Sequence, residues 1–104
     1  INKIMKISIT GRHVDITNAL NSYIKTKFQK LKKYSENIIN IHTILTVEKE
    51  RMKAEATLKT KNGNLFAANE ENNMYAAIDE IVEKLDRQLK KEKEKITNYR
   101  RIDE

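Results

Sequence analysis

Residues Asn72–Lys95 read NNMYAAIDEIVEKLDRQLKKEKEK, and this stretch has the clearest periodicity in the chain. Its large apolar residues recur every three or four positions, which places them on one side of an α-helix. They are Met74, Ile78, Ile81, Val82, Leu85 and Leu89. Either Asn72 or Asn73 can cap this helix, because asparagine accepts hydrogen bonds from first-turn N–H groups. The pattern predicts an amphipathic helix that extends to about Thr97.

The sequence before this helix alternates with the two-residue period of β-strands. Residues 53–59 place Ala54, Ala56 and Leu58 on one side, and a short strand follows at Leu65–Asn69. Asn62-Gly63 lies between these strands, and it favours a type I′ turn, which needs positive φ at both central residues. The two segments therefore form a hairpin.

A longer strand precedes this hairpin and ends near Glu48, where the charged run Glu48–Arg51 forms the connecting turn. We expect four of its apolar residues to share one face: Ile39, Ile41, Leu45 and Val47. These positions differ by even numbers, as the strand period requires.

Near the N-terminus, Lys6–Thr10 alternates with Ile7 and Ile9 on one side, which predicts a first strand. The period then becomes helical, and Thr17 is the expected N-cap of a helix over residues 18–34. Its apolar stripe consists of Leu20, Ile24, Phe28 and Leu31.

The resulting order is β-α-β-β-β-α, which is an α+β fold with a four-stranded mixed sheet. A right-handed crossover makes the first two strands parallel, and both helices then run parallel to each other on one face of the sheet. The chain has 104 residues, no proline and no Gly/Ser linker, so we expect one domain over residues 5–97. Met5 is a candidate natural start, with residues 1–4 a non-native remnant and residues 98–104 a short basic tail.

The composition excludes several functional classes. The chain has no cysteine, two histidines and two glycines, so thiolate catalysis, a transition-metal site and a glycine-rich phosphate loop are not expected. No apolar run is long enough to cross a membrane. We predict no catalytic residue, no metal, no cofactor and no membrane partner. A net charge of +6 instead favours a polyanionic partner.

The positive charge is concentrated in the C-terminal halves of the two helices, because 13 of the 21 basic residues lie within residues 25–33 and 84–101, the second range including the start of the basic tail. Cations favour helix C-termini, but that effect fades within about one turn. On a helical wheel Lys84, Arg87, Lys91 and Lys95 share one flank of the second helix, and Asp79, Glu83 and Asp86 share the other. Parallel helices bring the two basic halves together, which predicts a groove for phosphates. The alternative is a basic face that is merely solvated.

Four segments together resemble the bacterial ribosome hibernation promoting factor family. They are ITGRHVDIT (Ile9–Thr17), KFQKLKKY (Lys27–Tyr34), VEKERMKAEATL (Val47–Leu58) and the Asn72–Lys95 stretch. The resemblance extends from Met5 to about Lys95. It implies a fold similar to double-stranded-RNA-binding domains and a cytoplasmic factor that acts by occupancy, not as an enzyme.

The resemblance further implies binding to the 30S subunit, where the protein contacts 16S rRNA in the mRNA and tRNA channel at the A and P sites. Its implied RNA-binding residues are Lys27, Lys30, Lys33, Lys84, Arg87, Gln88, Lys91 and Lys95. It also implies inactivation of 70S ribosomes in stationary phase or stress. The chain is most similar to the short form that assists 100S dimer formation alongside ribosome modulation factor.

Two other functions remain open from the residues alone. One is a general double-stranded-RNA-binding domain, which would bind any A-form duplex with similar affinity. The other is a basic protein-interaction module whose binding does not depend on RNA. The exposed face of the sheet is polar, so we expect the isolated protein to be a monomer.

Overall fold

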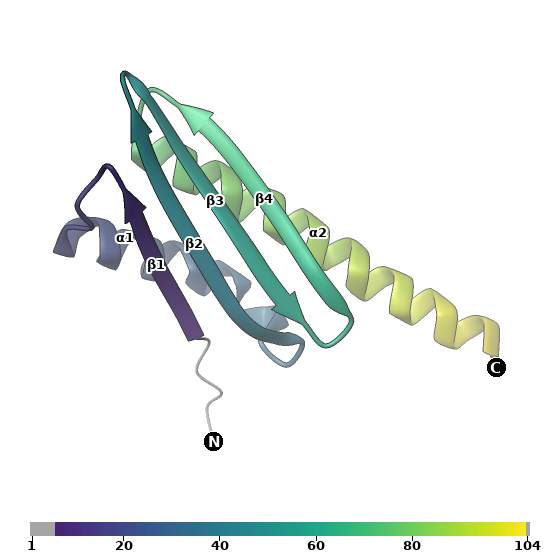
Figure 1. The fold of residues 1–104 in the computed structure, drawn as a ribbon. Helices are drawn as coiled ribbons and strands as arrows, with labels where there is room; N and C mark the ends of the chain where they lie inside the picture. Colours follow the sequence, from purple (N-terminus) through teal and green to yellow (C-terminus); the bar gives the residue numbers. More distant parts are fainter. Residues whose placement is uncertain (1–5, 104) are drawn as a thin grey trace.

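The computed structural model describes the backbone of residues 6–103 and the side chains of residues 6–94 (Figure 1). Its elements are β1 (Lys6–Arg12), α1 (Asn18–Phe28), the 3₁₀ helix η1 (Gln29–Tyr34), β2 (Ile38–Glu48), β3 (Arg51–Thr60), β4 (Gly63–Glu71) and α2 (Met74–Asp103). The sheet has the order β1-β2-β3-β4, with β1 parallel to β2 and the other neighbours antiparallel. Both helices lie behind the sheet in Figure 1, which confirms the predicted α+β fold.

The core lies between the sheet and the helices. Ile41 and Leu45 of β2 point inward, and Ile24 of α1 and Ile78 of α2 meet them from the helical layer. All four are at most 1% exposed. Burying such a side chain stabilises the fold by roughly 1.5–3 kcal/mol. Because these residues turn one face of each helix toward the sheet, the opposite face of each helix remains exposed and available to a partner.

Both helices begin at side-chain caps. The Thr17 hydroxyl accepts a hydrogen bond from the Leu20 N–H at 3.1 Å, as predicted. For α2, the Asn73 side chain accepts from the Tyr75 N–H at 2.8 Å, so Asn73 is the cap. Such caps satisfy N–H groups that have no partner within the helix.

The first helical segment differs from the prediction of one α-helix to Tyr34. The α-helix ends at Phe28 and continues as η1. A 3₁₀ helix has three residues per turn, so residues three apart lie on the same side. Phe28, Leu31 and Tyr34 follow this spacing and are all buried. The tighter helix therefore keeps Tyr34 on the core.

The prediction that Ile39 shares the core face of β2 is wrong. The register between β2 and β3 shifts between Ile38 and Asn40. An extra residue in one strand reverses which side chains face the core. Ile38 is therefore 1% exposed, whereas Ile39 is 44% exposed.

The type of the β3–β4 turn and the end of α2 also differ from the prediction. The β3–β4 hairpin forms at the predicted place, but Gly63 has a positive φ of 144° and Asn62 does not, so the turn is not type I′. The Thr60 hydroxyl instead accepts from the Asn62 N–H and donates to the Gly63 carbonyl. Helix α2 continues past Thr97 to Asp103, because the charged segment contains no glycine or proline that would end it.

Candidate nucleic-acid interface

Three ion pairs connect α1 and η1 to α2. Their nitrogen and oxygen atoms lie 3.4 Å apart in Lys27–Asp79 and in Lys33–Asp86, and Lys30–Glu83 lies between them. The partners advance in the same direction along both helical segments, so the helices are parallel, as predicted. We call this row of three pairs the seam.

Tyr23 extends the seam toward the N-terminal ends of the helices. Its hydroxyl donates a hydrogen bond to Asp79 at 2.6 Å, and this bond is the main reason that the pKa of Tyr23 is raised to about 12. The Tyr23 ring also meets the Tyr75 ring edge to face, with centroids 4.7 Å apart. Farther along, the hydrogen bond to Glu83 raises the pKa of Lys30. The phenol and the ammonium therefore keep their protons at neutral pH.

The seam changes the expected electrostatics of the groove. The acidic flank of α2 faces α1, so the seam is charge-balanced and the predicted basic groove between the helices contains three carboxylates as well as its lysines. The three lysines remain about half exposed, at 44%, 45% and 58% of their side-chain area. Ion pairs this exposed contribute little to stability, because water and salt screen them. Lys27, Lys30 and Lys33 can therefore still contact a phosphate from outside.

The opposite flank of α2 lies against the edge of β4. The Lys84 ammonium donates to the Ala68 carbonyl at 2.7 Å and to the Asn69 side chain at 3.4 Å. The Gln88 amide donates to the Phe66 carbonyl at 2.9 Å. These acceptors are uncharged, so Lys84 keeps a net positive charge at this flank. Lys84 and Gln88 thus have a structural contact besides the RNA contact that the resemblance implies.

Arg87 and Lys91 are the most available of the residues implied on α2. Both are exposed, and neither makes an ion pair among the described side chains. Lys95 lies in α2, but its side chain is outside the described residues. The implied residues therefore form two groups: the seam lysines, and the α2 residues on the flank toward β4.

The sequence reasoning missed a hollow at the C-terminal end of the seam. It has a volume of about 380 Å³, and Lys90 lies in it beside Lys33. Its other lining residues are Tyr34, Asp86, Lys93 and Glu94. Lys90 falls on the same side of the helical wheel as Asp86, so its position beside Asp86 in this hollow could have been predicted from the sequence. Three lysines here face two carboxylates, which leaves this end of the seam basic.

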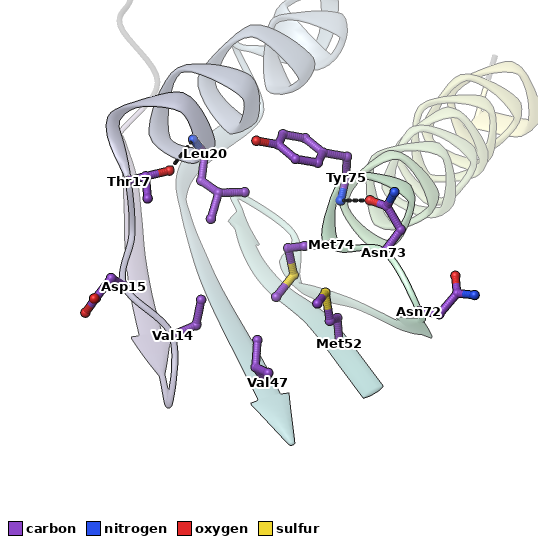
Figure 2. Close-up of a pocket in the computed structure, with 10 residues that line it drawn as sticks. All are labelled: Val14, Asp15, Thr17, Leu20, Val47, Met52, Asn72, Asn73, Met74 and Tyr75. Carbon is purple, nitrogen blue, oxygen red and sulfur yellow. Dashed lines mark hydrogen bonds between the residues drawn. The ribbon is translucent and has the colours of Figure 1, made fainter. Parts of the chain in front are cut away.

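A second hollow, of about 470 Å³, lies at the other pole, where both helices begin (Figure 2). Val47, Met52 and Met74 make much of its lining apolar, and Asp15 is its one charged lining residue. This pole is remote from the lysine-rich helix ends, and no lysine or arginine lines the hollow.

The described residues contain neither a cluster of metal ligands nor a helix suited to span a membrane. Among them no group of three or more His, Asp or Glu side chains is placed to hold a metal ion. No helix in the described part of the chain is long and apolar enough to cross a bilayer.

Known proteins share both the sequence and this fold. Residues 7–97 match the family described as Sigma 54 modulation protein / S30EA ribosomal protein. The ribosome hibernation promoting factor of Pseudomonas putida is 44% identical over 91 residues, which are 88% of this chain and 89% of that protein. The factor of the same name from Salmonella typhimurium is 42% identical over 95 residues, which are 91% of this chain and all of that protein.

Solved structures agree with these matches. A ribosomal subunit interface protein from Coxiella burnetii superimposes with a TM-score of 0.81 and 32% identity, over 86% of this chain and 98% of that one. The N-terminal domain of Protein Y from Thermus thermophilus gives 0.79 and 28%, over 84% and 98%. The chain therefore belongs to the ribosome hibernation promoting factor and sigma-54 modulation protein family, whose members are non-enzymatic ribosome-associated factors.

Proposed function

We propose that this protein binds the 30S subunit and contacts 16S rRNA in the mRNA and tRNA channel, at the A and P sites. By occupying the channel in stationary phase or stress it inactivates 70S ribosomes, and it assists 100S dimer formation, with ribosome modulation factor as a further partner. It acts in the cytoplasm and is a monomer when free. Its contacts are Lys27, Lys30, Lys33, Lys84, Arg87, Gln88, Lys91 and Lys95.

One observation carries this proposal: the parallel helices bring their lysine-rich C-terminal halves together on the layer opposite the open sheet. The seam neutralises part of the charge between the helices, but Arg87, Lys90 and Lys91 remain exposed and positive toward solvent. Phosphates bind such side chains through charge-assisted hydrogen bonds. Because relatives of this chain are ribosome hibernation promoting factors, we take the RNA of the ribosome to be the polyanion that these side chains bind.

The test is charge reversal at Arg87 and Lys91, since neither side chain holds the fold together. We expect Arg87→Glu/Lys91→Glu to lose most 30S binding while its circular dichroism spectrum is unchanged. The dependence of binding on salt should also decrease, by about 0.7–0.9 in log–log slope for each lost phosphate contact.

The matched control is Lys25→Glu/Lys32→Glu, which changes the net charge equally at exposed positions of α1 and η1 that the resemblance does not implicate. It should keep most of the binding. Equal losses in both variants would contradict the assigned site, and unchanged binding in the first variant would contradict the proposal itself. Equal affinity for any RNA duplex would favour a general double-stranded-RNA binder.

A further inference from the structure

The helices cover one face of the sheet and leave the other face uncovered (Figure 1). Two complete rows of exposed side chains lie on the uncovered face near the β3–β4 turn. The strand register aligns them across all four strands. One row is Lys6, Asn40, Lys59 and Asn64, and the next is Ser8, His42, Thr57 and Phe66. All eight are exposed. We call these eight residues the open-face patch.

The open-face patch contains no carboxylate, although the chain as a whole has 15 acidic residues. Lys6 and Lys59 make no ion pair among the described residues. The other half of the same face differs, because Glu55 pairs with Lys53 at 3.1 Å and Glu70 pairs with Arg51 at 2.9 Å. The patch is thus the part of the sheet that is complementary to an anion.

The patch also presents two rings. Phe66 is 55% exposed, more than the other exposed large apolar residues of the described chain, Ile39 and Tyr75. His42 is exposed, and its Nδ1 lies 2.6 Å from the Ser8 hydroxyl, which orients the imidazole. Only Thr57 of β3 separates the two in their row, so their backbones lie about 10 Å apart.

We propose that the open-face patch binds single-stranded RNA. Unpaired bases stack on exposed aromatic side chains of a sheet, and lysines contact the phosphates between them. The side-chain amides of Asn40 and Asn64 can donate to and accept from base edges. A duplex has its bases stacked inside and cannot use these rings. This site is separate from the helix face of the proposed function, so the protein would hold two RNA segments on opposite faces.

The experiment measures binding of a fluorescent oligouridylate of twelve nucleotides by anisotropy, with a labelled RNA duplex in parallel. We expect Phe66→Ala to weaken oligouridylate binding at least about fivefold, since one lost stacking contact is worth that much. Phe66→Trp should retain binding, because the larger ring restores the stack. Lys6→Gln/Lys59→Gln should weaken binding and lower the salt slope by about 0.7 for each lysine.

Two controls separate this site from the helix face. Lys53→Gln removes a lysine from the same face outside the patch, and it should change oligouridylate binding less than twofold. Arg87→Glu/Lys91→Glu should lose ribosome binding but retain oligouridylate. Wild-type affinity in Phe66→Ala would overturn the proposal, as would a wild-type protein that does not bind oligouridylate at low salt. Loss of oligouridylate binding only in the Arg87 and Lys91 variant would place the single strand on the helix face and would also overturn it.

Discussion

At the scale of single residues, Tyr23 connects the two helices. Its hydroxyl donates to Asp79, its ring meets Tyr75 edge to face, and the Lys27 ammonium lies 5.5 Å from its centroid. A hydrogen bond to a charged acceptor contributes about 1.5–3 kcal/mol when buried and less when partly exposed, as here. Tyr23 therefore fixes how α1 lies against α2.

The raised pKa of Tyr23 predicts a pH dependence. The folded pKa is about 12 and the ordinary value is 10.0, so this stabilisation is complete below pH 10 and is lost as pH rises to 12. We expect Tyr23→Phe to lower the free energy of unfolding by about 1 kcal/mol at pH 8, in urea titrations. Its difference from wild type should shrink between pH 10 and pH 12.

The control for this prediction is Tyr75→Phe, because the Tyr75 hydroxyl makes no hydrogen bond among the described residues. At pH 8 it should change the free energy of unfolding by less than about 0.5 kcal/mol, because it removes a hydroxyl without such a bond. A Tyr23→Phe difference that stays constant to pH 12 would show that the hydrogen bond to Asp79 does not stabilise the fold.

At the scale of elements, α2 closes the free edge of β4. An edge strand presents unpaired backbone groups that can pair with another chain. Lys84 and Gln88 occupy the carbonyls of Ala68 and Phe66 on this edge. The predicted RNA-binding flank of α2 is thus also the element that protects the sheet.

This contact predicts that Lys84→Ala destabilises the protein, whereas the neighbouring Arg87→Ala does not. Loss of the charged hydrogen bond to the Ala68 carbonyl should reduce the free energy of unfolding by about 1–2 kcal/mol in urea titrations. An exposed residue without such a contact should change it by less than about 0.5 kcal/mol. Equal values for the two variants would contradict a structural role for Lys84.

The order and direction of the elements were predictable, because apolar residues recur with periods of two and of three to four. Ile39 was misplaced because one extra residue in β2 reverses the alternation. The shift shows only in the pairing of Ile38 with Thr60 and of Asn40 with Lys59, which are far apart in the sequence. The wheel placed Asp79, Glu83 and Asp86 on one flank of α2, but it could not say which flank faces α1. That depends on how the helices lie side by side on the sheet, so the charge-balanced seam needed the structure.

At the scale of the whole molecule, surfaces of different character lie on different sides of the fold. The helix layer has its lysine-rich end at the C-terminal halves, and the apolar hollow with Asp15 lies at the other pole. The sheet face is open (Figure 1). If the protein occupies the mRNA and tRNA channel as we propose, it needs such surfaces and a rigid core between them, and it does not need a catalytic residue.

The most direct test is co-sedimentation with purified 30S, 50S and 70S particles over a salt series, with excess RNA duplex as competitor. We predict that the protein remains on 30S and 70S particles, is absent from 50S particles, and is not displaced by the duplex. Binding to all three particles with equal affinity, or release by the duplex, would contradict a specific site on the small subunit.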